Sequence, residues 1–190
     1  IRISESLARR KENSVEGDSL ITIAEKAIIR DYAQGKKCLV EVGVCWGGTS
    51  MIIREVMDPG GIYYLVDPFL PTVPGQRITP SLELAKKNVE SIQNGKVVWY
   101  VNTSVEASSL FEKEATSKID FCFIDGLHDQ LPVLQDWLSW KQHIAPGGFV
   151  LFHDVSNVWP GVLAAWNLIK KTEGWECIGV KRSIGIMKKL

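Results

Sequence analysis

Short apolar runs alternate with stretches of helical period along this chain. The apolar runs are rich in β-branched and aromatic residues, which is typical of buried strands. They cover residues 37–43, 62–66, 97–101, 119–124, 149–152, 177–180 and 184–187. Helical spacing of apolar residues predicts helices over 14–35, 49–56, 81–92, 104–113, 131–143 and 161–171. Asp18 or Ser19 should cap the first helix and Gly35 should end it, and a turn is expected over residues 146–148.

This order of elements predicts one fold class. Strands that alternate with helices form parallel βαβ units, so we expect an α/β protein with a doubly wound, Rossmann-like sheet. The sheet should have seven mostly parallel strands, with helices on both faces. The last two runs are too close together for a crossover helix, so they should pair as a hairpin and make the last strand antiparallel. We expect residues 1–17 to be a polar N-terminal segment and residues 18–190 to be a single domain.

The composition narrows the range of partners. The chain has 190 residues, 45% of them hydrophobic, and its 22 basic and 22 acidic residues cancel. Electrostatics therefore gives no reason to expect nucleic acid or an anionic membrane, and a small molecule or neutral polymer is the expected substrate. No apolar run approaches the roughly 20 residues that span a bilayer, and the polar N-terminus does not resemble a secretory signal. The four cysteines form no CxxC pair, which suits reduced thiols in a cytoplasmic protein.

In a doubly wound sheet, ligands bind beyond the carboxyl ends of the strands, near the point where the strand order reverses. The turn after the first strand reads EVGVCWGGTS. Gly43, Gly47 and Gly48 let the backbone approach a ligand closely, and the helix that opens at Thr49 offers N–H groups to a carboxylate. The turn is not a GxGxxG motif, because Cys45 stands where that motif has glycine. A plain strand-to-helix turn is the alternative interpretation.

Residues after the second and third strands are candidates for contact with a nucleoside. Asp67 follows the second strand, where an acid can accept hydrogen bonds from both ribose hydroxyls, although Asp-Pro also simply begins loops. Together with the glycine turn, Asp67 indicates a nucleoside-type ligand. Phe69 either borders the adenine or packs on the core as a lid residue. Ser104 follows the third strand, and it either contacts the adenine or ribose or caps the next helix.

Histidines and carboxylates follow the fourth and fifth strands. Asp125 and His128 come after the fourth strand, and His153 and Asp154 come after the fifth. All four should meet in one cleft, where they can hold a divalent cation or move protons. A structural hydrogen-bond network is the alternative, since ion-pair networks often look like sites. His143 lies near a helix end and is interpreted as structural.

Three segments of the chain resemble the class I S-adenosylmethionine-dependent methyltransferases. They are EVGVCWGGTS, LVDPF and IDFCFIDGLHDQLPVLQDWLSWKQHIAPGGFVLFHDV. More closely, they are similar to methyltransferase family 24 and look related to catechol-type and macrocin-type O-methyltransferases. The resemblance covers about residues 14–180, and the third segment is its specific part. It implies an enzyme with a single class I domain and S-adenosylmethionine as cofactor.

The resemblance also implies site residues. Glu41 and Gly43 would line the methionine end of the cofactor, and Asp67 would bind its ribose. The expected cofactor-binding set is Glu41, Gly43, Gly47, Gly48, Thr49, Asp67, Phe69, Ser104 and Asp125. Metal-dependent relatives hold Mg²⁺ with an Asp after the fourth strand and a pair of residues after the fifth. Here the expected ligands of Mg²⁺ or another divalent cation are Asp125, His153 and Asp154, and the imidazole of His153 departs from the family pattern because it suits softer metals.

The expected reaction is in-line methyl transfer to a hydroxyl oxygen of a small molecule or sugar. Catechol-type relatives place a lysine base three residues after the metal-binding Asp, and this position is His128 here. His128 would take the hydroxyl proton, while Asp125 orients the oxygen with or without a cation. The candidates to shape the acceptor pocket are Trp46, Phe69, Arg77 and Trp159.

Other interpretations remain open at this stage. A metal-dependent hydrolase or oxygenase on the same fold would use the same histidines and carboxylates. A non-catalytic module that senses S-adenosylmethionine would have no need of Asp125, His128 and Asp154. A dinucleotide dehydrogenase is disfavoured by the missing GxGxxG motif. Relatives often dimerise, so a homodimer is compatible with the resemblance.

Overall fold

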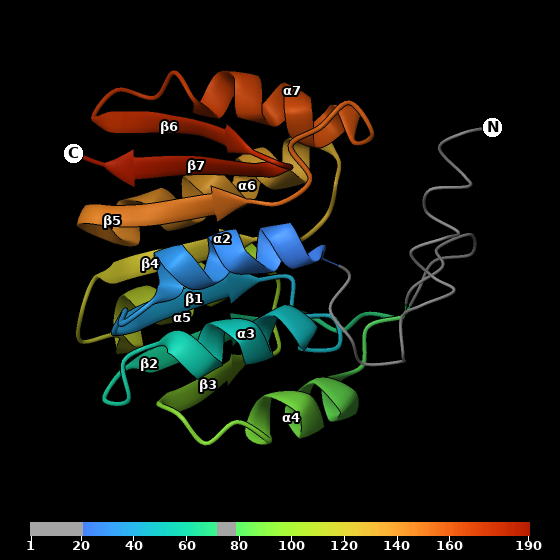
Figure 1. Ribbon diagram of the computed structural model, residues 1–190, viewed down its shortest axis with the longest axis vertical. Coiled ribbons are helices and arrows are strands. Elements are labelled where there is room, and N and C mark those ends of the chain that lie inside the picture. The colour runs from blue at the N-terminus through green and yellow to red at the C-terminus, as the bar shows by residue number, and fades with distance from the viewer. Residues whose placement is uncertain (1–20, 72–78) are drawn as a thin grey trace.

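The computed structural model describes residues 21–71 and 79–190 and contains one seven-stranded sheet (Figure 1). The strands are β1 (Cys38–Val42), β2 (Ile62–Val66), β3 (Lys96–Tyr100), β4 (Ile119–Ile124), β5 (Ile144–Phe152), β6 (Trp175–Lys181) and β7 (Ile184–Lys189). Their order is β3-β2-β1-β4-β5-β7-β6. β7 runs antiparallel to both of its neighbours, β5 and β6, while the pairs from β3 to β5 are parallel. The expected Rossmann-like sheet, hairpin and antiparallel last strand are confirmed.

Helices cover both faces of the sheet. The helices are α2 (Ile23–Ala33), α3 (Gly48–Val56), α4 (Leu82–Glu90), α5 (Ser104–Glu114), α6 (Gln130–Trp140) and α7 (Pro160–Ile169), with a 3₁₀ turn η1 (Lys141–His143). One hydrophobic core lies between the sheet and α2, α3 and α4, and a second lies between the sheet and α5, α6 and α7 (Figure 1). Among the described helices, none is long and apolar enough to cross a membrane.

The central strand β1 contributes to both cores, because successive side chains of a strand point to opposite faces. All five of its residues are buried. Val40 and Val42 face the α5–α7 core, and Leu39 faces the α2–α4 core. Glu41 shares the face of Leu39, so its carboxyl group is buried beneath α2, α3 and α4. A carboxyl group at this place needs partners, and they are described below.

Two helices begin at residues other than those expected. Thr22 caps α2 in a capping box with Glu25, so the expected caps Asp18 and Ser19, which lie outside the described residues, are wrong. Thr103 likewise caps α5 in a capping box with Glu106. Ser104 is the first residue of α5 rather than its cap. In both helices the Thr-x-x-Glu pattern satisfies two backbone N–H groups reciprocally, which a lone serine or aspartate cannot do.

Strand β5 is longer than expected and includes the predicted turn over residues 146–148. Ile144 already pairs with Ile119, and the register then shifts before Phe149 pairs with Phe121. Gly147 has a φ of 79°, a conformation that glycine adopts without strain. The turn residues are therefore an irregularity within a strand, and they leave the carboxyl end of β5 where it was expected, at Phe152.

Candidate active site

The glycine turn after β1 lies directly against the chain that follows β4. Gly43 has a φ of 91°, and a Cβ atom at this position would lie 2.1 Å from the carbonyl oxygen of Asp125. Asp125 N also donates a hydrogen bond of 2.8 Å to the carbonyl oxygen of Val42. Only glycine fits here without displacing the backbone, so the turn brings the predicted cofactor segment beside the histidines and carboxylates.

The same turn leads into α3 through a second close approach. Gly47 is the N-cap of α3, with a φ of 78° and no side-chain cap. A Cβ atom at Gly47 would lie 2.9 Å from the side chain of Val89 on α4. Gly48 opens the helix, and Thr49 is buried in its first turn. A helix that starts without a side-chain cap suits an anionic group near its first N–H groups.

Asp67 holds the glycine turn in place. Its Oδ2 accepts hydrogen bonds of 2.9 Å from the backbone N–H groups of Val44 and Cys45, and its Oδ1 accepts one of 2.7 Å from Phe69 N. Cys45 and Phe69 have positive φ values of 55° and 48°. The ring of Phe69 packs on Trp99, with centroids 6.4 Å apart. Asp67 thus fixes two strained loop residues at the edge of the sheet.

Glu41 is fully buried, and one of its oxygens has no partner. Its Oε2 accepts hydrogen bonds from Ser50 Oγ and, at 2.6 Å, from Tyr63 OH. Its Oε1 is buried without a hydrogen-bond partner among the described residues. Burial raises the pKa of Glu41 to about 8, although the bonds from Ser50 and Tyr63 oppose this rise. Ser50 and Tyr63 could not be predicted from the sequence, because their contact with Glu41 depends on the packing of α3 and β2 against β1.

Asp125, His128, His153 and Asp154, here called the His–Asp cluster, come together as expected. Nδ1 of His153 donates a 2.9 Å hydrogen bond to Oδ1 of Asp125 and lies 3.5 Å from Oδ2 of Asp154. Nε2 of His128 lies 3.2 Å from Oδ2 of Asp154 and 3.8 Å from Oδ1 of Asp125. Asp154 has a φ of 58°, a conformation in which a non-glycine residue is strained, so the loop after β5 is held in an unusual shape at this point.

The two imidazoles and the carboxylates of the cluster stabilise one another's charges. Burial by itself lowers the pKa of His128 and of His153, but the neighbouring carboxylates raise both values to about 9. Burial likewise raises the pKa of Asp125, but the charge and hydrogen bond of His153, together with the nearby imidazole of His128, lower it to about 2. At neutral pH the cluster therefore contains imidazolium and carboxylate groups in contact.

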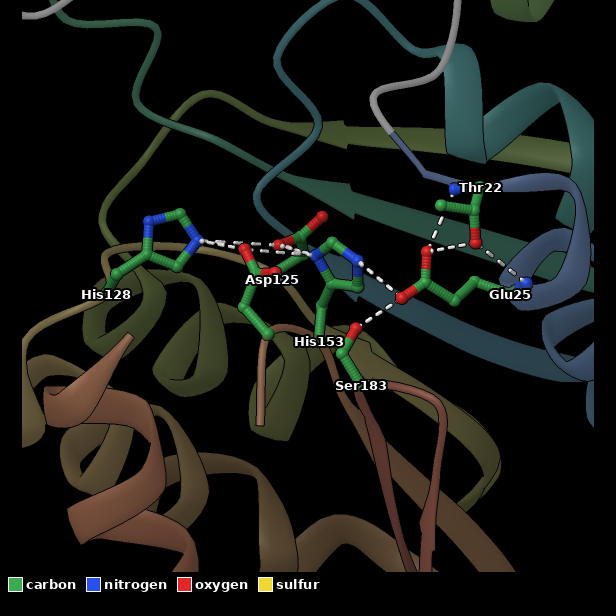
Figure 2. Close-up of polar contacts among 7 residues, drawn as sticks. Thr22, Glu25, Asp125, His128, His153 and Ser183 are labelled. Atoms are coloured by element: carbon green, nitrogen blue, oxygen red, sulfur yellow. Dashed lines mark hydrogen bonds and ion pairs between the residues drawn. The ribbon is translucent and has the colours of Figure 1, made fainter. Parts of the chain in front are cut away.

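The cluster also gathers metal-ligating atoms, but in a different set from the one expected. One ligand atom each from Asp125, His128 and Asp154 lie within 4.8 Å of one another. The expected third ligand, His153, instead uses Nδ1 to bind Asp125 and turns Nε2 towards Glu25 on α2 (Figure 2). Two carboxylate oxygens and one imidazole nitrogen suit a divalent cation that accepts mixed oxygen and nitrogen ligands.

Glu25 is a buried carboxylate that lies beside the His–Asp cluster, and the sequence did not indicate it as a site residue. Its Oε1 accepts a hydrogen bond from Ser183 Oγ and lies 4.0 Å from Nε2 of His153. Its Oε2 accepts hydrogen bonds from Thr22, at 2.9 Å from the backbone nitrogen and 2.5 Å from Oγ1. The Thr-x-x-Glu spacing could have marked this residue as a helix cap, but nothing in the sequence places it next to His153.

The loop before α7 covers one side of His128. The indole ring of Trp159 stacks on the imidazole, with centroids 4.2 Å apart and planes 26° apart. A Cβ atom at Gly161 would lie 2.4 Å from the carbonyl oxygen of His128, so α7 begins in close contact with this loop. Leu127 and Val158 are exposed on the same two loops, and Leu131 is exposed in the first turn of α6. The side chain of His128 therefore has an aromatic wall on one side.

The remaining candidates lie further from the cluster or outside the described residues. The hydroxyl of Ser104 accepts a 2.9 Å hydrogen bond from Trp140 Nε1 within the α5–α6 contact, so its contact with a cofactor stays a prediction. Trp46 donates through Nε1 to the carbonyl oxygen of Thr79. His143 is buried with Nε2 3.1 Å from Ser108 Oγ, in keeping with a structural role. Arg77 lies outside the described residues.

A family model provides the decisive comparison. The model of methyltransferase family 24, described as a methyltransferase domain, matches residues 40–155, which is more than half of the chain. The chain belongs to this methyltransferase family. The match begins in β1 and ends just after Asp154, so it spans the glycine turn and the His–Asp cluster of the methyltransferase. The resemblance to class I S-adenosylmethionine-dependent methyltransferases is thus confirmed.

Solved structures show the same fold at low sequence identity. An O-methyltransferase from Bacillus cereus in complex with S-adenosylhomocysteine is 16% identical, with a TM-score of 0.69 over 99% of this chain and 90% of that one. The O-methyltransferase TomG from Streptomyces achromogenes, in complex with S-adenosylmethionine, is 11% identical, with a TM-score of 0.72 over 99% and 88%. The O-methyltransferase NovP is 16% identical, with a TM-score of 0.68 over 90% and 81%. No curated protein sequence matches the methyltransferase.

Proposed function

We propose that this methyltransferase binds S-adenosylmethionine at the carboxyl edge of its sheet and methylates a hydroxyl oxygen of a small molecule or sugar. The observation that carries the proposal is the contact at Gly43, where the glycine turn meets the chain at Asp125. This contact supports the proposal, because it brings the glycine turn next to imidazoles and carboxylates of the kind that move protons. The O-methyltransferases of similar fold, crystallised with S-adenosylmethionine or S-adenosylhomocysteine, support the choice of cofactor.

The proposed cofactor site follows the turn. It comprises Glu41, Gly43, Gly47, Gly48, Thr49, Asp67, Phe69, Ser104 and Asp125. The unpartnered Oε1 of Glu41 offers an acceptor for an ammonium group at the methionine end. Asp67 has two oxygens with about four acceptor positions, of which three are used, so Oδ1 can still accept from a ribose hydroxyl. The uncapped start of α3 would face the methionine carboxylate.

The reaction proposed for this site is a one-step displacement. The acceptor oxygen forms a bond to the methyl carbon as the bond from this carbon to sulfur breaks, which leaves S-adenosylhomocysteine. His128 takes the hydroxyl proton on a ring nitrogen, since it is the more exposed imidazole of the cluster. Asp125 and Asp154 then stabilise the imidazolium, and Trp159 fixes the plane of the ring. The protein mainly positions the reactants, because the sulfonium is already a strong electrophile.

A divalent cation fits the same cluster. Asp125, His128 and Asp154 would hold it in place of the proton on His128, and when bound it would polarise the acceptor hydroxyl and lower the need for His128 as a base. A cation bound by two carboxylates and one imidazole should be detected by calorimetric titration of chelator-treated protein with Mn²⁺, Zn²⁺ or Mg²⁺. Asp154→Asn should weaken this binding at least 10-fold, as expected for the loss of a ligand. Equal binding by the variant and the unmodified protein would rule out this metal site.

The test of the proposed function begins with the cofactor. S-adenosylhomocysteine at about 100 times its dissociation constant should raise the melting temperature by about 5–11 °C, whereas NAD should not. A folded protein that melts at the same temperature with and without S-adenosylhomocysteine would contradict the cofactor proposal. Transfer of labelled methyl groups from S-adenosylmethionine to a panel of phenols and sugars would then identify the acceptor.

Two other functions remain as outcomes of these experiments. Binding of S-adenosylhomocysteine without transfer to any hydroxyl compound would favour a non-catalytic binding module. Tightly bound zinc or iron in the purified protein, together with no thermal shift, would favour a metal-dependent hydrolase or oxygenase on this fold. The proposal places the protein in the cytoplasm and includes a homodimer, which gel filtration with light scattering would test.

A further inference from the structure

We propose that Glu25, from the first described helix, is a positioning residue for the His–Asp cluster and acts through the imidazole of His153. The catalytic part of this inference rests on the proposed methyl transfer, whereas the orientation of the imidazole can be tested without any transfer. In Figure 2 the side chain of His153 lies between Asp125 and Glu25, with one carboxylate on each side of the ring.

The position of Glu25 is unusual for a carboxylate that only caps a helix. The side chain of Glu25 is 3% exposed. A capping box requires only its contacts with Thr22, and here Oε2 alone makes these contacts. The other oxygen, Oε1, points away from the helix end. It accepts from Ser183 in the β6–β7 turn and lies 4.0 Å from Nε2 of His153. Glu25 therefore joins three parts of the chain, of which only one is its own helix.

The carboxylate of Glu25 stabilises the buried imidazole of His153. His153 is 6% exposed, and its Nε2 has no hydrogen-bond partner among the described residues. An unpaired polar nitrogen in a buried site is costly, and a carboxylate 4.0 Å away compensates electrostatically. Rotation of the ring by 180° would exchange carbon and nitrogen positions and break the 2.9 Å bond to Asp125. A negative charge on the Nε2 side disfavours this rotated state.

The orientation of His153 also affects His128, the proposed base. His153 binds the same oxygen of Asp125, Oδ1, that lies 3.8 Å from His128. An imidazole that is held in one orientation fixes this oxygen, and Asp125 in turn helps to align the ring of His128. Glu25 would thus preorganise the cluster from a distance without contact with the substrate.

The capping box supplies a clean experiment. Glutamine serves in the third position of a capping box as well as glutamate does, so Glu25→Gln keeps the helix cap while it replaces the charged oxygen near His153 and Ser183 with a neutral amide. Thr22→Ala is the matched variant, because it breaks the cap and leaves the carboxylate facing His153. A purely structural Glu25 predicts that Thr22→Ala has the larger effect, and a positioning Glu25 predicts the reverse.

We expect Glu25→Gln to change the side-chain ¹⁵N and ¹H NMR signals of His153 at constant pH and to leave affinity for S-adenosylhomocysteine within about two-fold. In the methyl-transfer assay, kcat should fall roughly 10-fold while KM for the acceptor is unchanged. Thr22→Ala should lower the melting temperature and leave the His153 signals and kcat unchanged well below that temperature. Unchanged His153 signals in Glu25→Gln would overturn the proposal, as would equal losses of kcat in the two variants.

A second variant covers the case in which Glu25→Gln does not fold. Ser183→Ala removes the hydrogen bond that fixes Oε1 and leaves both the charge and the cap of α2. It should shift the His153 signals, and Ser183→Thr, which keeps the hydroxyl, should not. Unshifted signals in Ser183→Ala would contradict the inference. If no methyl transfer is found with any acceptor, the NMR result still decides whether Glu25 positions His153, so the two proposals can fail separately.

Discussion

The imidazole of His128 and the indole of Trp159 are stacked, with ring centroids 4.2 Å apart and planes 26° apart. The two residues come from loops after different strands, so the stack joins the loop after β4 to the start of α7. An aromatic face against a protonated imidazole is favourable, and the stack also excludes water from one side of the ring. The proposed base is therefore oriented by an aromatic residue as well as by carboxylates.

Replacement of Trp159 should show how much the orientation of the His128 ring contributes to methyl transfer. Trp159→Phe retains an aromatic face and should keep most of the activity. Trp159→Ala removes a contact worth about 0.5–1.5 kcal/mol, so kcat should fall roughly 2- to 12-fold without loss of cofactor affinity. Steady-state kinetics together with S-adenosylhomocysteine titration would check this. Full activity of Trp159→Ala would show that the stack has no role in transfer.

Removal of the His128 imidazole should abolish transfer and spare cofactor binding. A general base contributes about 10²- to 10⁴-fold, so His128→Ala should lose at least 100-fold in kcat and bind S-adenosylhomocysteine normally. The control is His143→Ala, since His143 is a buried histidine remote from the cluster with its own partner, Ser108. Turnover by His128→Ala at the unmodified rate would assign the base to another residue.

The pH dependence of kcat should report the same imidazole. Although burial lowers the pKa of His128, Asp125 and Asp154 raise it to about 9, and only the neutral ring can accept a proton. The rate should therefore rise about 10-fold per pH unit from pH 6.5 and level off near pH 9. Asp154→Asn removes one of the two carboxylates, so the rise should occur at lower pH. A profile that is flat from pH 6.5 to 9 would contradict the role of His128.

Asp136 should make the folded protein less stable as pH rises. This residue of α6 is 6% exposed, and burial raises its pKa to about 6 from 3.8, against a hydrogen bond from Ser104. The folded state then binds its proton more tightly than the unfolded chain, so the free energy of unfolding falls between about pH 4 and pH 6 and stays lower above.

Asp136→Asn removes this titration and keeps a polar group for Ser104. Urea unfolding should show the variant to be about 1–3 kcal/mol more stable than the unmodified protein at pH 7.5, with the gain lost at pH 4. A matched control is Asp120→Asn, because the carboxylate of Asp120 accepts hydrogen bonds from the backbone N–H groups of Lys37 and Cys38. Loss of this carboxylate should lower the free energy of unfolding. A gain for Asp136→Asn that is the same at pH 4 and pH 7.5 would show that its carboxyl group does not titrate between them.

The sheet could be predicted from the sequence because each strand is a short apolar run with its own turn signals. The His–Asp cluster could also be predicted, since Asp125 and His153 follow neighbouring parallel strands whose carboxyl ends meet. The sequence could not predict which atoms of these side chains face one another. His153 directs Nδ1 to Asp125 and Nε2 to Glu25, and Glu25 is 128 residues away from it in the chain. Side-chain orientation at this distance is a property of packing, not of local pattern.

Gly43 provides the most direct test of the contact between the cofactor turn and the cluster. A Cβ atom at this position would lie 2.1 Å from Asp125 O and 2.8 Å from Gly126 N, both of which are backbone atoms that cannot rotate away. Gly43→Ala should therefore displace Asp125 and reduce both cofactor affinity and kcat by at least 10-fold. Gly174→Ala is the matched control, because its φ of 76° imposes a similar backbone strain of about 1 kcal/mol with no atom within 4 Å. Calorimetric titration with S-adenosylhomocysteine should show a loss for Gly43→Ala alone. Equal effects of the two variants would mean that the strain of a positive φ, and not the close approach to Asp125, makes glycine necessary at this turn.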